Sequence, residues 1–329
     1  MIDNFSTDFL VRPPWMSDLK AVHKVLEVCD IAEYGTPDFT LEDLRSTWQG
    51  PTFNLAMDAW MVVAPGGQIV GYAEMQHRQH VHIYTLVRVL PEYAGRGIDK
   101  HLLHLAEEWA QRQISLANPD ARVTLFSWES SLNNTTQLAL LQTGFREVRR
   151  SWRMEIGMSQ APFAPAWPDQ VTVRTFVPAR DIRTVYTAIE EAFQDHWGHM
   201  EGNFDEWKHW TIDRENFDPT LWFLAFDGEE IAGISLCTYQ VEFGWVDTLA
   251  VRRPWRRKGL GMALLLHSFC EFYRRGKSKV GLGVDSQNLT GATRLYERAG
   301  MHVARTYISY EKELRAGVEL STQAIPISS

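Results

Sequence analysis

The chain has 329 residues, 45% of them hydrophobic, and a formal net charge of −8. This length exceeds one ordinary domain and favours two domains of about 150 residues, each able to bury a sizeable core. The negative charge argues against general nucleic-acid binding, because a protein that neutralises phosphates needs a basic surface.

Other features of the composition exclude further classes. No stretch approaches the roughly 20 apolar residues of a membrane span, and residues 1–4 lack the basic start of a signal peptide. The three cysteines, Cys29, Cys237 and Cys270, are far apart and match no metal-ligand spacing. We therefore expect a cytoplasmic protein with reduced thiols, no membrane partner and no bound metal.

The second half of the chain repeats the first. Four landmarks recur at one offset of 162 (173 − 11, 210 − 48, 233 − 71 and 259 − 97): Val11, Trp48, Gly71 and Gly97 match Val173, Trp210, Gly233 and Gly259. Gly144 matches Gly300 at an offset of 156 (300 − 144). Such self-similarity indicates a tandem duplication.

Both copies contain the same series of expected elements. In chain order each runs as a strand (9–12; 171–176), helices, a strand pair, a motif strand, a motif helix, another strand and a final helix. The strand pairs turn at 64–67 and 227–230, where Pro, Gly and Asp favour tight turns. This mixed order predicts an α/β fold, with a central sheet and helices on both faces.

Proline content marks the boundary between the copies. The prolines at 162, 165 and 168 exclude a helix or a central strand and predict a semi-rigid linker. We expect a first domain over 1–156, a linker over 157–170, a second domain over 171–314 and a loose tail over 315–329.

The most informative motif is the turn that joins an apolar strand, 246–251, to an apolar helix, 260–273. Gly259 and Gly261 let the backbone approach a ligand closely, which a Cβ would prevent. The first N–H groups of a helix have no internal partner, and the helix dipole favours an anion there. Five basic side chains surround the turn: Arg252, Arg253, Arg256, Arg257 and Lys258. The pattern predicts a phosphate site, and the alternative is a tight turn with a solvated basic edge.

This turn differs from two common phosphate motifs. No Gly-Lys-Ser/Thr string surrounds Gly259, and Leu264 stands where a dinucleotide fingerprint needs its third glycine. The turn instead resembles the Gln/Arg-x-x-Gly-x-Gly/Ala signature of the GNAT superfamily of N-acetyltransferases. The resemblance implies two tandem domains, each a mostly antiparallel sheet flanked by helices, and acetyl-CoA as co-substrate. It assigns the pyrophosphate to the turn residues Arg256, Arg257, Lys258, Gly259, Leu260, Gly261 and Met262.

A second family segment follows at 283–301. Asn288 can both donate and accept hydrogen bonds at a loop, and the resemblance places the pantetheine amides there. Tyr296 lies near a helix end that Gly300 closes as a C-cap. The resemblance makes Tyr296 the proton donor to the departing CoA thiolate, and the alternative is an ordinary buried tyrosine.

The motif strand carries the remaining chemistry. The resemblance implies that the thioester and pantetheine contact backbone groups of Leu249, Ala250 and Val251. Asp247 lies two and four residues before Leu249 and Val251, so alternation predicts all three on one sheet face. Asp247 is therefore a candidate base for the amine proton, with Glu242 as the second candidate and a structural aspartate as the alternative.

The first copy keeps this motif only in outline. Ala94 replaces Arg256, and Asp99 replaces Gly261, so a carboxylate opposes an anion at the helix start. Leu140 stands at the tyrosine position (296 − 140 = 156) and cannot donate a proton. We expect a catalytically silent first domain that walls the acceptor pocket or stabilises its partner.

Acceptor recognition is assigned to the segment 193–200. Asp195, His196 and Trp197 offer a carboxylate, an imidazole and an indole for a cationic or aromatic amine, and the alternative is a packed helix end. No residue identifies the acceptor, which we expect to be a small-molecule or peptide amine. We expect a monomer or homodimer.

The sequence thus predicts an acetyl-CoA-dependent N-acetyltransferase that transfers acetyl to a primary amine by direct attack on the thioester. One alternative is the acetylation of a cysteinyl–sugar amine, as in the tandem mycothiol synthases of the superfamily. Another is a non-catalytic acyl-CoA-binding module.

Overall fold

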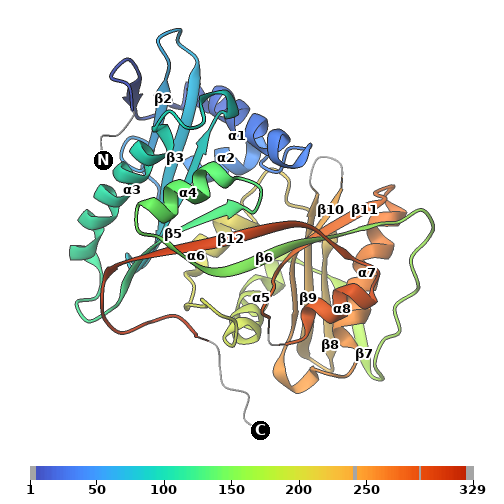
Figure 1. Ribbon diagram of the computed structural model, residues 1–329. Coiled ribbons are helices and arrows are strands. Elements are labelled where there is room, and N and C mark those ends of the chain that lie inside the picture. Colours follow the sequence, from blue (N-terminus) through green and yellow to red (C-terminus); the bar gives the residue numbers. More distant parts are fainter. Residues whose placement is uncertain (1–4, 240–242, 289, 324–329) are drawn as a thin grey trace. The chain divides into compact units, whose positions relative to one another are not determined.

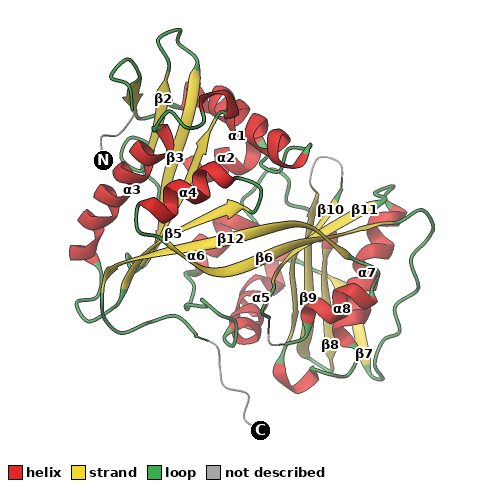
Figure 2. Ribbon diagram, viewed as in Figure 1, coloured by secondary structure: helices red, strands yellow, loops and turns green. Residues whose placement is uncertain are grey.

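The computed structural model describes residues 5–239, 243–288 and 290–323. The chain divides into two compact units: Met1–Arg150 with Arg305–Leu320, and Ser151–Ala304 with Ser321–Ser329. Each unit contains strands of a mixed sheet with helices packed on them (Figure 1, Figure 2). The expected α/β class is confirmed.

The first half of the chain forms four α-helices and six strands among its described residues. In chain order they are β1 (Leu10–Arg12), α1 (Leu19–Tyr34), α2 (Leu41–Trp48), β2 (Ala59–Val63), β3 (Ile69–Arg78), β4 (His82–Val89), α3 (Ile98–Gln113), β5 (Val123–Ser130), α4 (Asn134–Gln142) and β6 (Arg146–Gly157).

The second half repeats the series. Its elements are β7 (Val171–Thr175), α5 (Pro178–Phe193), α6 (Phe204–Thr211), β8 (Trp222–Asp227), β9 (Glu230–Tyr239), β10 (Gly244–Val251), α7 (Leu260–Arg274), β11 (Lys279–Asp285), α8 (Ala292–Arg298) and β12 (His302–Arg315).

The two units have the same strand order. In the first unit, β1, β2, β3 and β4 pair antiparallel, β4 pairs parallel with β5, and β5 pairs antiparallel with β12. In the second unit, β7, β8, β9 and β10 pair antiparallel, β10 pairs parallel with β11, and β11 pairs antiparallel with β6. Each sheet is therefore mostly antiparallel, as expected.

The last strand of each half lies in the sheet of the other unit. Strand β6 pairs with β11 from Ser151 opposite Asp285 to Gly157 opposite Lys279. Strand β12 pairs with β5 from Tyr307 opposite Ser130 onward. The contiguous domains expected over 1–156 and 171–314 did not include this exchange of a strand, a form of domain swapping within one chain.

Side chains on the exchanged strands explain why they are held. Met154 of β6 is fully buried in the core of the second unit. In the first unit, Arg122 forms ion pairs with Glu311 and Glu313 of β12, at 2.6 and 2.7 Å. Each sheet thus gains a buried or ion-paired strand that its own half does not supply.

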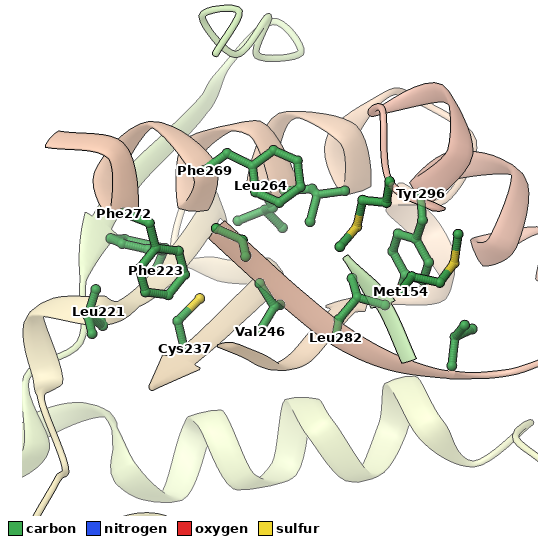
Figure 3. Packing of buried hydrophobic residues seen from close by; sticks show 14 of the residues in the cluster. Met154, Leu221, Phe223, Cys237, Val246, Leu264, Phe269, Phe272, Leu282 and Tyr296 are labelled. Atoms are coloured by element: carbon green, nitrogen blue, oxygen red, sulfur yellow. The ribbon is translucent and has the colours of Figure 1, made fainter. Parts of the chain in front are cut away.

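The second unit has a core on each face of its sheet. Val185, Ile189 and Ala192, spaced for one helix face, pack α5 on one face together with Ala250. Helices α7 and α8 cover the other face, where Leu264, Phe269 and Tyr296 meet β6, β10 and β11. Figure 3 shows Met154 beside the ring of Tyr296 in this second cluster.

The described part of the C-terminal segment is bound to the rest of the chain. The N–H of Arg122 donates to the Val318 carbonyl at 2.9 Å. The N–H of Thr322 donates to the His199 carbonyl, and the N–H of Gly198 donates to the Thr322 carbonyl, both at 2.8 Å. The segment that was expected to be loose is therefore fixed by backbone hydrogen bonds as far as Thr322.

Candidate active site

The turn between β10 and α7 has the backbone that its glycines predict. Gly259 precedes α7 with a left-handed φ of 85°, and no described side chain caps the helix start. A Cβ on Gly261 would lie 3.2 Å from Cδ1 of Leu295 in α8. Gly261 thus serves two purposes, because it keeps the first turn of α7 open and permits close packing against α8.

The basic side chains at this turn fall into two groups. Arg252 is paired with Glu191 at 2.8 Å, and Arg253 is paired with Asp195. Arg257 and Lys258 are exposed beside Gly259. Their charges therefore face solvent at the start of α7, where an anion would bind.

Arg256, the first residue of the signature, binds the protein itself. Its Nε donates to the carbonyl of Val251 at 3.1 Å, and its Nη2 donates to the carbonyl of Ala192 at 2.9 Å. Its Nη1 donates to the Asp195 carboxylate at 3.1 Å. The guanidinium therefore ties the end of β10 and the last turn of α5 to the turn.

The three predicted acceptor residues follow α5. Both oxygens of Asp195 accept from Arg253, and these hydrogen bonds hold the pKa of the carboxyl below its usual range. The ring of His196 lies 4.4 Å from that of Phe193, and burial lowers its pKa. Trp197 is half-buried. The structure places Asp195 against the arginines of the turn.

Strand β10 contains a β-bulge at the candidate base. Val246 pairs with Cys237, and Thr248 pairs with the preceding residue Leu236, so Asp247 is the extra residue. Val246, Leu249 and Val251 all pack in the core beside α7, although Val246 and Leu249 are an odd number of positions apart. The prediction that simple alternation aligns Asp247 with Leu249 and Val251 is therefore wrong.

Strands β10 and β11 diverge beyond a short ladder. Their parallel pairing covers Gly244 to Val246 and Val280 to Leu282. Leu249, Ala250 and Val251 lie past its end, while their other edge pairs with β9. The backbone edge of 249–251 that faces β11 is thus outside the ladder.

The other predicted base, Glu242, lies outside the described residues. Asp247 itself is exposed, next to the ladder's end. Of the two candidate bases, the structure therefore places only Asp247.

The loop after β11 holds Asn288. Its Oδ1 accepts from the N–H of Thr290 at 2.8 Å, and its N–H donates to the Asp285 carbonyl at 3.0 Å. These bonds orient the side chain and leave its NH₂ as the donor group.

Tyr296 lies on α8, whose end has the expected cap. The N–H of Met301 donates to the Tyr296 carbonyl at 3.0 Å, and Gly300 has a φ of 93°. The Tyr296 side chain is buried, and burial raises its pKa to about 12. No described residue hydrogen-bonds its hydroxyl, which therefore stays protonated and able to donate.

The first unit has a corresponding turn before α3, but a carboxylate lies at the start of that helix. Gly95 and Gly97 have φ values of 75° and 78°, matching Arg257 and Gly259 at 63° and 85°. Asp99 is buried, and its Oδ1 accepts from the N–H of Lys100 at 2.9 Å. A protein carboxylate thus occupies the helix start of this unit.

One residue beside the site was missed in the sequence. Asp285, at the end of β11, is near enough to His196 to raise its pKa, against the larger effect of burial. The signal that could have found it is the repeat, because Glu129 stands at its position in the first copy (285 − 129 = 156).

The part of the chain that the structure describes contains neither a metal centre nor a helix that could cross a membrane. Among the described residues no three His, Cys, Asp or Glu side chains gather as metal ligands would. No helix in the same part of the chain has the length and apolar character to cross a bilayer.

Comparison with known proteins identifies relatives over most of the chain. The model of the acetyltransferase (GNAT) family matches residues 19–126 and 182–301. The chain is 29% identical to a mycothiol acetyltransferase of Streptomyces scabiei over 259 residues, which are 77% of this chain and 79% of that protein. It is 27% identical to a mycothiol acetyltransferase of Cellulomonas flavigena over 317 residues, covering 90% and 84%.

Two solved structures are also similar to this chain. A GCN5-related N-acetyltransferase from Sphaerobacter thermophilus is similar with a TM-score of 0.83 and 37% identity, covering 97% of this chain and all of that one. A tandem GNAT protein of clavulanic acid biosynthesis shares the fold, with a TM-score of 0.73 and 14% identity over 94% of this chain and all of that one.

Proposed function

The chain belongs to the acetyltransferase (GNAT) family, and on that premise we propose that its second unit transfers the acetyl group of acetyl-CoA to a primary amine. The observation that carries the proposal is the combination, in one unit, of an uncapped helix start at Gly259 with the protonated hydroxyl of the buried residue Tyr296. The first feature binds an anion and the second supplies a proton.

The cofactor phosphates are assigned to the turn. The first N–H groups of α7 point away from the helix, and Gly259 adds no side chain to cover them. Exposed Arg257 and Lys258 add positive charge. The role of Arg256 in this proposal is to fix the turn, because its guanidinium is bonded to Val251, Ala192 and Asp195.

The thioester is assigned to the backbone of 249–251, past the end of the β10–β11 ladder. A backbone N–H there polarises the acetyl carbonyl as negative charge develops on its oxygen. The NH₂ of Asn288 donates to an amide of the pantetheine arm. These contacts hold the carbonyl carbon in place for attack.

Each proton that leaves a group during the reaction is accepted by another group. The Asp247 carboxylate takes a proton from the acceptor ammonium, directly or through water. The neutral amine forms the C–N bond as the C–S bond breaks, and Tyr296 gives its proton to the leaving sulfur. The nitrogen loses its second proton, which returns to the tyrosine oxygen, and the products are the amide and CoA.

We assign no catalysis to the first unit. Asp99 bonds the Lys100 N–H at the start of α3, and Leu140 is fully buried at the tyrosine position. Its role in the proposal is to hold β12, while its own sequence provides β6 to the active unit.

The acceptor is assigned to small amines. The resemblance to the tandem mycothiol synthases makes the cysteinyl amine of a glucosamine–inositol conjugate the first compound to test. Incubation with acetyl-CoA and this amine, with CoA release followed by chromatography and the amide by mass spectrometry, tests the proposal. Absence of acetyl-CoA binding by the purified chain would overturn it.

A further inference from the structure

The segment that contains the predicted acceptor residues, 194–199, follows α5, and its counterpart in the first unit is the end of α1. The buried faces of the two helices align at an offset of 163 (185 − 22 and 189 − 26), which pairs Val22 and Leu26 with Val185 and Ile189. At this offset Gly198 matches Gly35 (198 − 35 = 163), and the two glycines have left-handed φ values of 75° and 74°. The two helix ends can therefore be compared from one matched residue.

In the first unit the matched glycine follows a complete helix. Helix α1 runs to Tyr34, and the N–H of Gly35 donates to the carbonyl of Ile31 at 2.8 Å. A left-handed glycine that bonds back to the last turn in this way is a common end of an α-helix. The bond gives the Ile31 carbonyl a partner that the helix itself does not supply.

In the second unit the same turn is open. Helix α5 ends at Phe193, so residues 194–197 lie outside it, although their counterparts, residues 31–34, are the last turn of α1. The N–H of His196 donates to the Phe193 carbonyl at 2.8 Å, three residues back, which is the spacing of a tight turn and not of an α-helix. The second unit therefore lacks a helical turn that the first unit has.

Thr322 of the C-terminal segment binds both partners of the missing turn. The N–H of Gly198 donates to the Thr322 carbonyl at 2.8 Å. The carbonyl of Gln194, which matches that of Ile31 (194 − 31 = 163), accepts from Oγ1 of Thr322 at 2.9 Å. One residue thus stands between the donor and the acceptor that would close the last turn of α5.

Other contacts fix Thr322 in this place. Its N–H donates to the carbonyl of His199 at 2.8 Å. The preceding residue, Ser321, is buried, and its Oγ accepts from Nε2 of Gln323 at 3.0 Å. Residues 321–323, which we call the strap, belong to the same compact unit as α5. The strap is therefore bonded to the loop on the donor side and on the acceptor side.

The local sequence does not explain the open turn. Residues 194–197 include no proline and no glycine, and a glycine such as Gly198 is typical of the position after a helix end. The sequence therefore favours one more turn of α5, as in α1. The contact with Thr322 is the physical reason that this turn is absent.

The opened segment connects the strap with the cofactor turn. The carboxylate of Asp195 accepts hydrogen bonds from Arg253 and Arg256, just before the start of α7. His196 and Trp197 follow in the chain and are half-buried. The predicted acceptor residues are thus held between a contact to the turn at one end and a contact to Thr322 at the other.

Given the acetyltransferase function proposed above, we propose that Thr322 is a positioning residue for the amine acceptor, because its insertion opens the last turn of α5 and holds residues 194–199 as the acceptor loop. Thr322 does not touch the substrate in this account and acts through the loop. Asp247 remains the base, and Tyr296 remains the acid.

The first test follows the loop itself and needs no acceptor. Thr322→Pro removes the hydroxyl that donates to Gln194 and the N–H that donates to His199. In deuterated full-length protein we expect the NMR ¹³Cα shifts of residues 194–197 to move towards helical values in this variant. Shifts that equal those of the wild-type protein would overturn the proposal.

The second test measures steady-state kinetics in a graded series. Thr322→Val removes the hydroxyl alone at nearly constant volume, and Thr322→Ser keeps it. We expect the amine KM to rise about 10-fold or more in Thr322→Pro, the scale of one to two hydrogen bonds. The rise should be smaller in Thr322→Val and absent in Thr322→Ser. The kcat should stay within about 2-fold, because the reacting atoms are not touched.

Two further measurements show that the effect is specific. The acetyl-CoA Kd should change less than the amine KM, because Arg256 keeps its bonds to the Val251 and Ala192 carbonyls. Thr187→Val is the matched control, since it removes an exposed threonine hydroxyl of α5 that donates to the Arg183 carbonyl at 3.1 Å. This variant should leave the amine KM unchanged.

The outcomes separate the role of Thr322 from the proposed function. The kinetic probe is whichever of the cysteinyl–glucosamine–inositol amine and benzylamine the wild-type protein acetylates faster. Turnover of that amine with the same KM in Thr322→Pro and wild-type protein contradicts the positioning role and leaves the acetyltransferase function intact. Protein that fails to bind acetyl-CoA contradicts the function itself.

Discussion

The carboxylate of Asp99 accepts a hydrogen bond of 2.9 Å from the backbone N–H of Lys100, in the first turn of α3. The corresponding residue of α7 is Gly261, which has no side chain to make such a bond. Two helix starts with the same left-handed glycine, Gly97 and Gly259, thus differ in whether an anion from the protein is already present.

Gly261→Asp should place a carboxylate at the start of α7, as Asp99 does at the start of α3. A Cβ alone would press on Leu295 at 3.2 Å, so Gly261→Ala is the matched control for size. We expect the acetyl-CoA Kd of the aspartate variant to exceed that of the alanine variant about 10-fold or more, because the carboxylate repels phosphate. Equal Kd values in calorimetry would mean that charge at this position is unimportant.

Arg256→Ala should lower stability as well as affinity. The guanidinium makes hydrogen bonds to Val251, Ala192 and Asp195, and each such bond contributes about 1 kcal/mol. We expect a lower Tm and a smaller loss of acetyl-CoA affinity than Gly261→Asp causes. Arg257→Ala, at an exposed residue, should weaken binding without changing Tm. A larger affinity loss for Arg256→Ala than for Gly261→Asp would contradict this account of the turn.

Tyr296→Phe should reduce kcat about 100-fold or more, the usual scale of general acid catalysis, and leave the acetyl-CoA Kd unchanged. Burial raises the pKa of the hydroxyl to about 12, so it stays protonated throughout the assay range. A decline of the wild-type rate below pH 10 should therefore have another origin and persist in the variant. A variant with wild-type kcat would exclude Tyr296 as the proton donor.

The first unit should lose stability as the pH rises from about 5 to 8. Burial raises the pKa of Glu129 to about 7 from its ordinary value of 4.5, in spite of Arg88. Because the folded pKa is the higher one, this contribution is full below pH 4.5 and is lost as the pH passes 7. Burial raises the pKa of Asp30 and Glu33 as well, which acts in the same direction.

Calorimetric Tm values from pH 5 to 8 measure this effect. Glu129→Gln should flatten the decline, whereas Glu92→Gln, at an exposed residue, should not. A Tm that rises over this interval in the wild-type protein, with no difference in Glu129→Gln, would contradict the predicted loss of stability with rising pH.

The sequence was sufficient to predict the duplication and the turn, for a physical reason. Left-handed backbone requires particular residues, so Gly97 and Gly259 mark the same bend in both copies. The cap at Gly300 is predictable on the same grounds. A backbone conformation that favours particular residues can therefore be predicted from the residue at that position.

Features that depend on residues far away in the sequence could not be predicted in this way. Strands β6 and β12 stand at matching places in the two halves, and nothing local specifies which sheet each joins. The bulge at Asp247 arises from pairing with β9, and it reversed the face predicted from spacing. The hydrogen bond from Arg256 to the Ala192 carbonyl depends on where α5 ends.

Strand exchange also affects how the units should be tested. A fragment that ends near residue 160 would contain β6 without its partner β11 and would lack β12. Point variants of the full chain therefore separate the two units more cleanly than deletions do.

The central claim is that the second unit alone binds acetyl-CoA. Calorimetric titration of the full chain with acetyl-CoA, fitted for stoichiometry, tests it most directly. We predict one site per chain, whose Kd rises about 10-fold or more in Gly261→Asp relative to Gly261→Ala and is unaffected by Asp99→Ala. Two sites per chain, or a Kd that is the same in Gly261→Asp and Gly261→Ala, would contradict the claim.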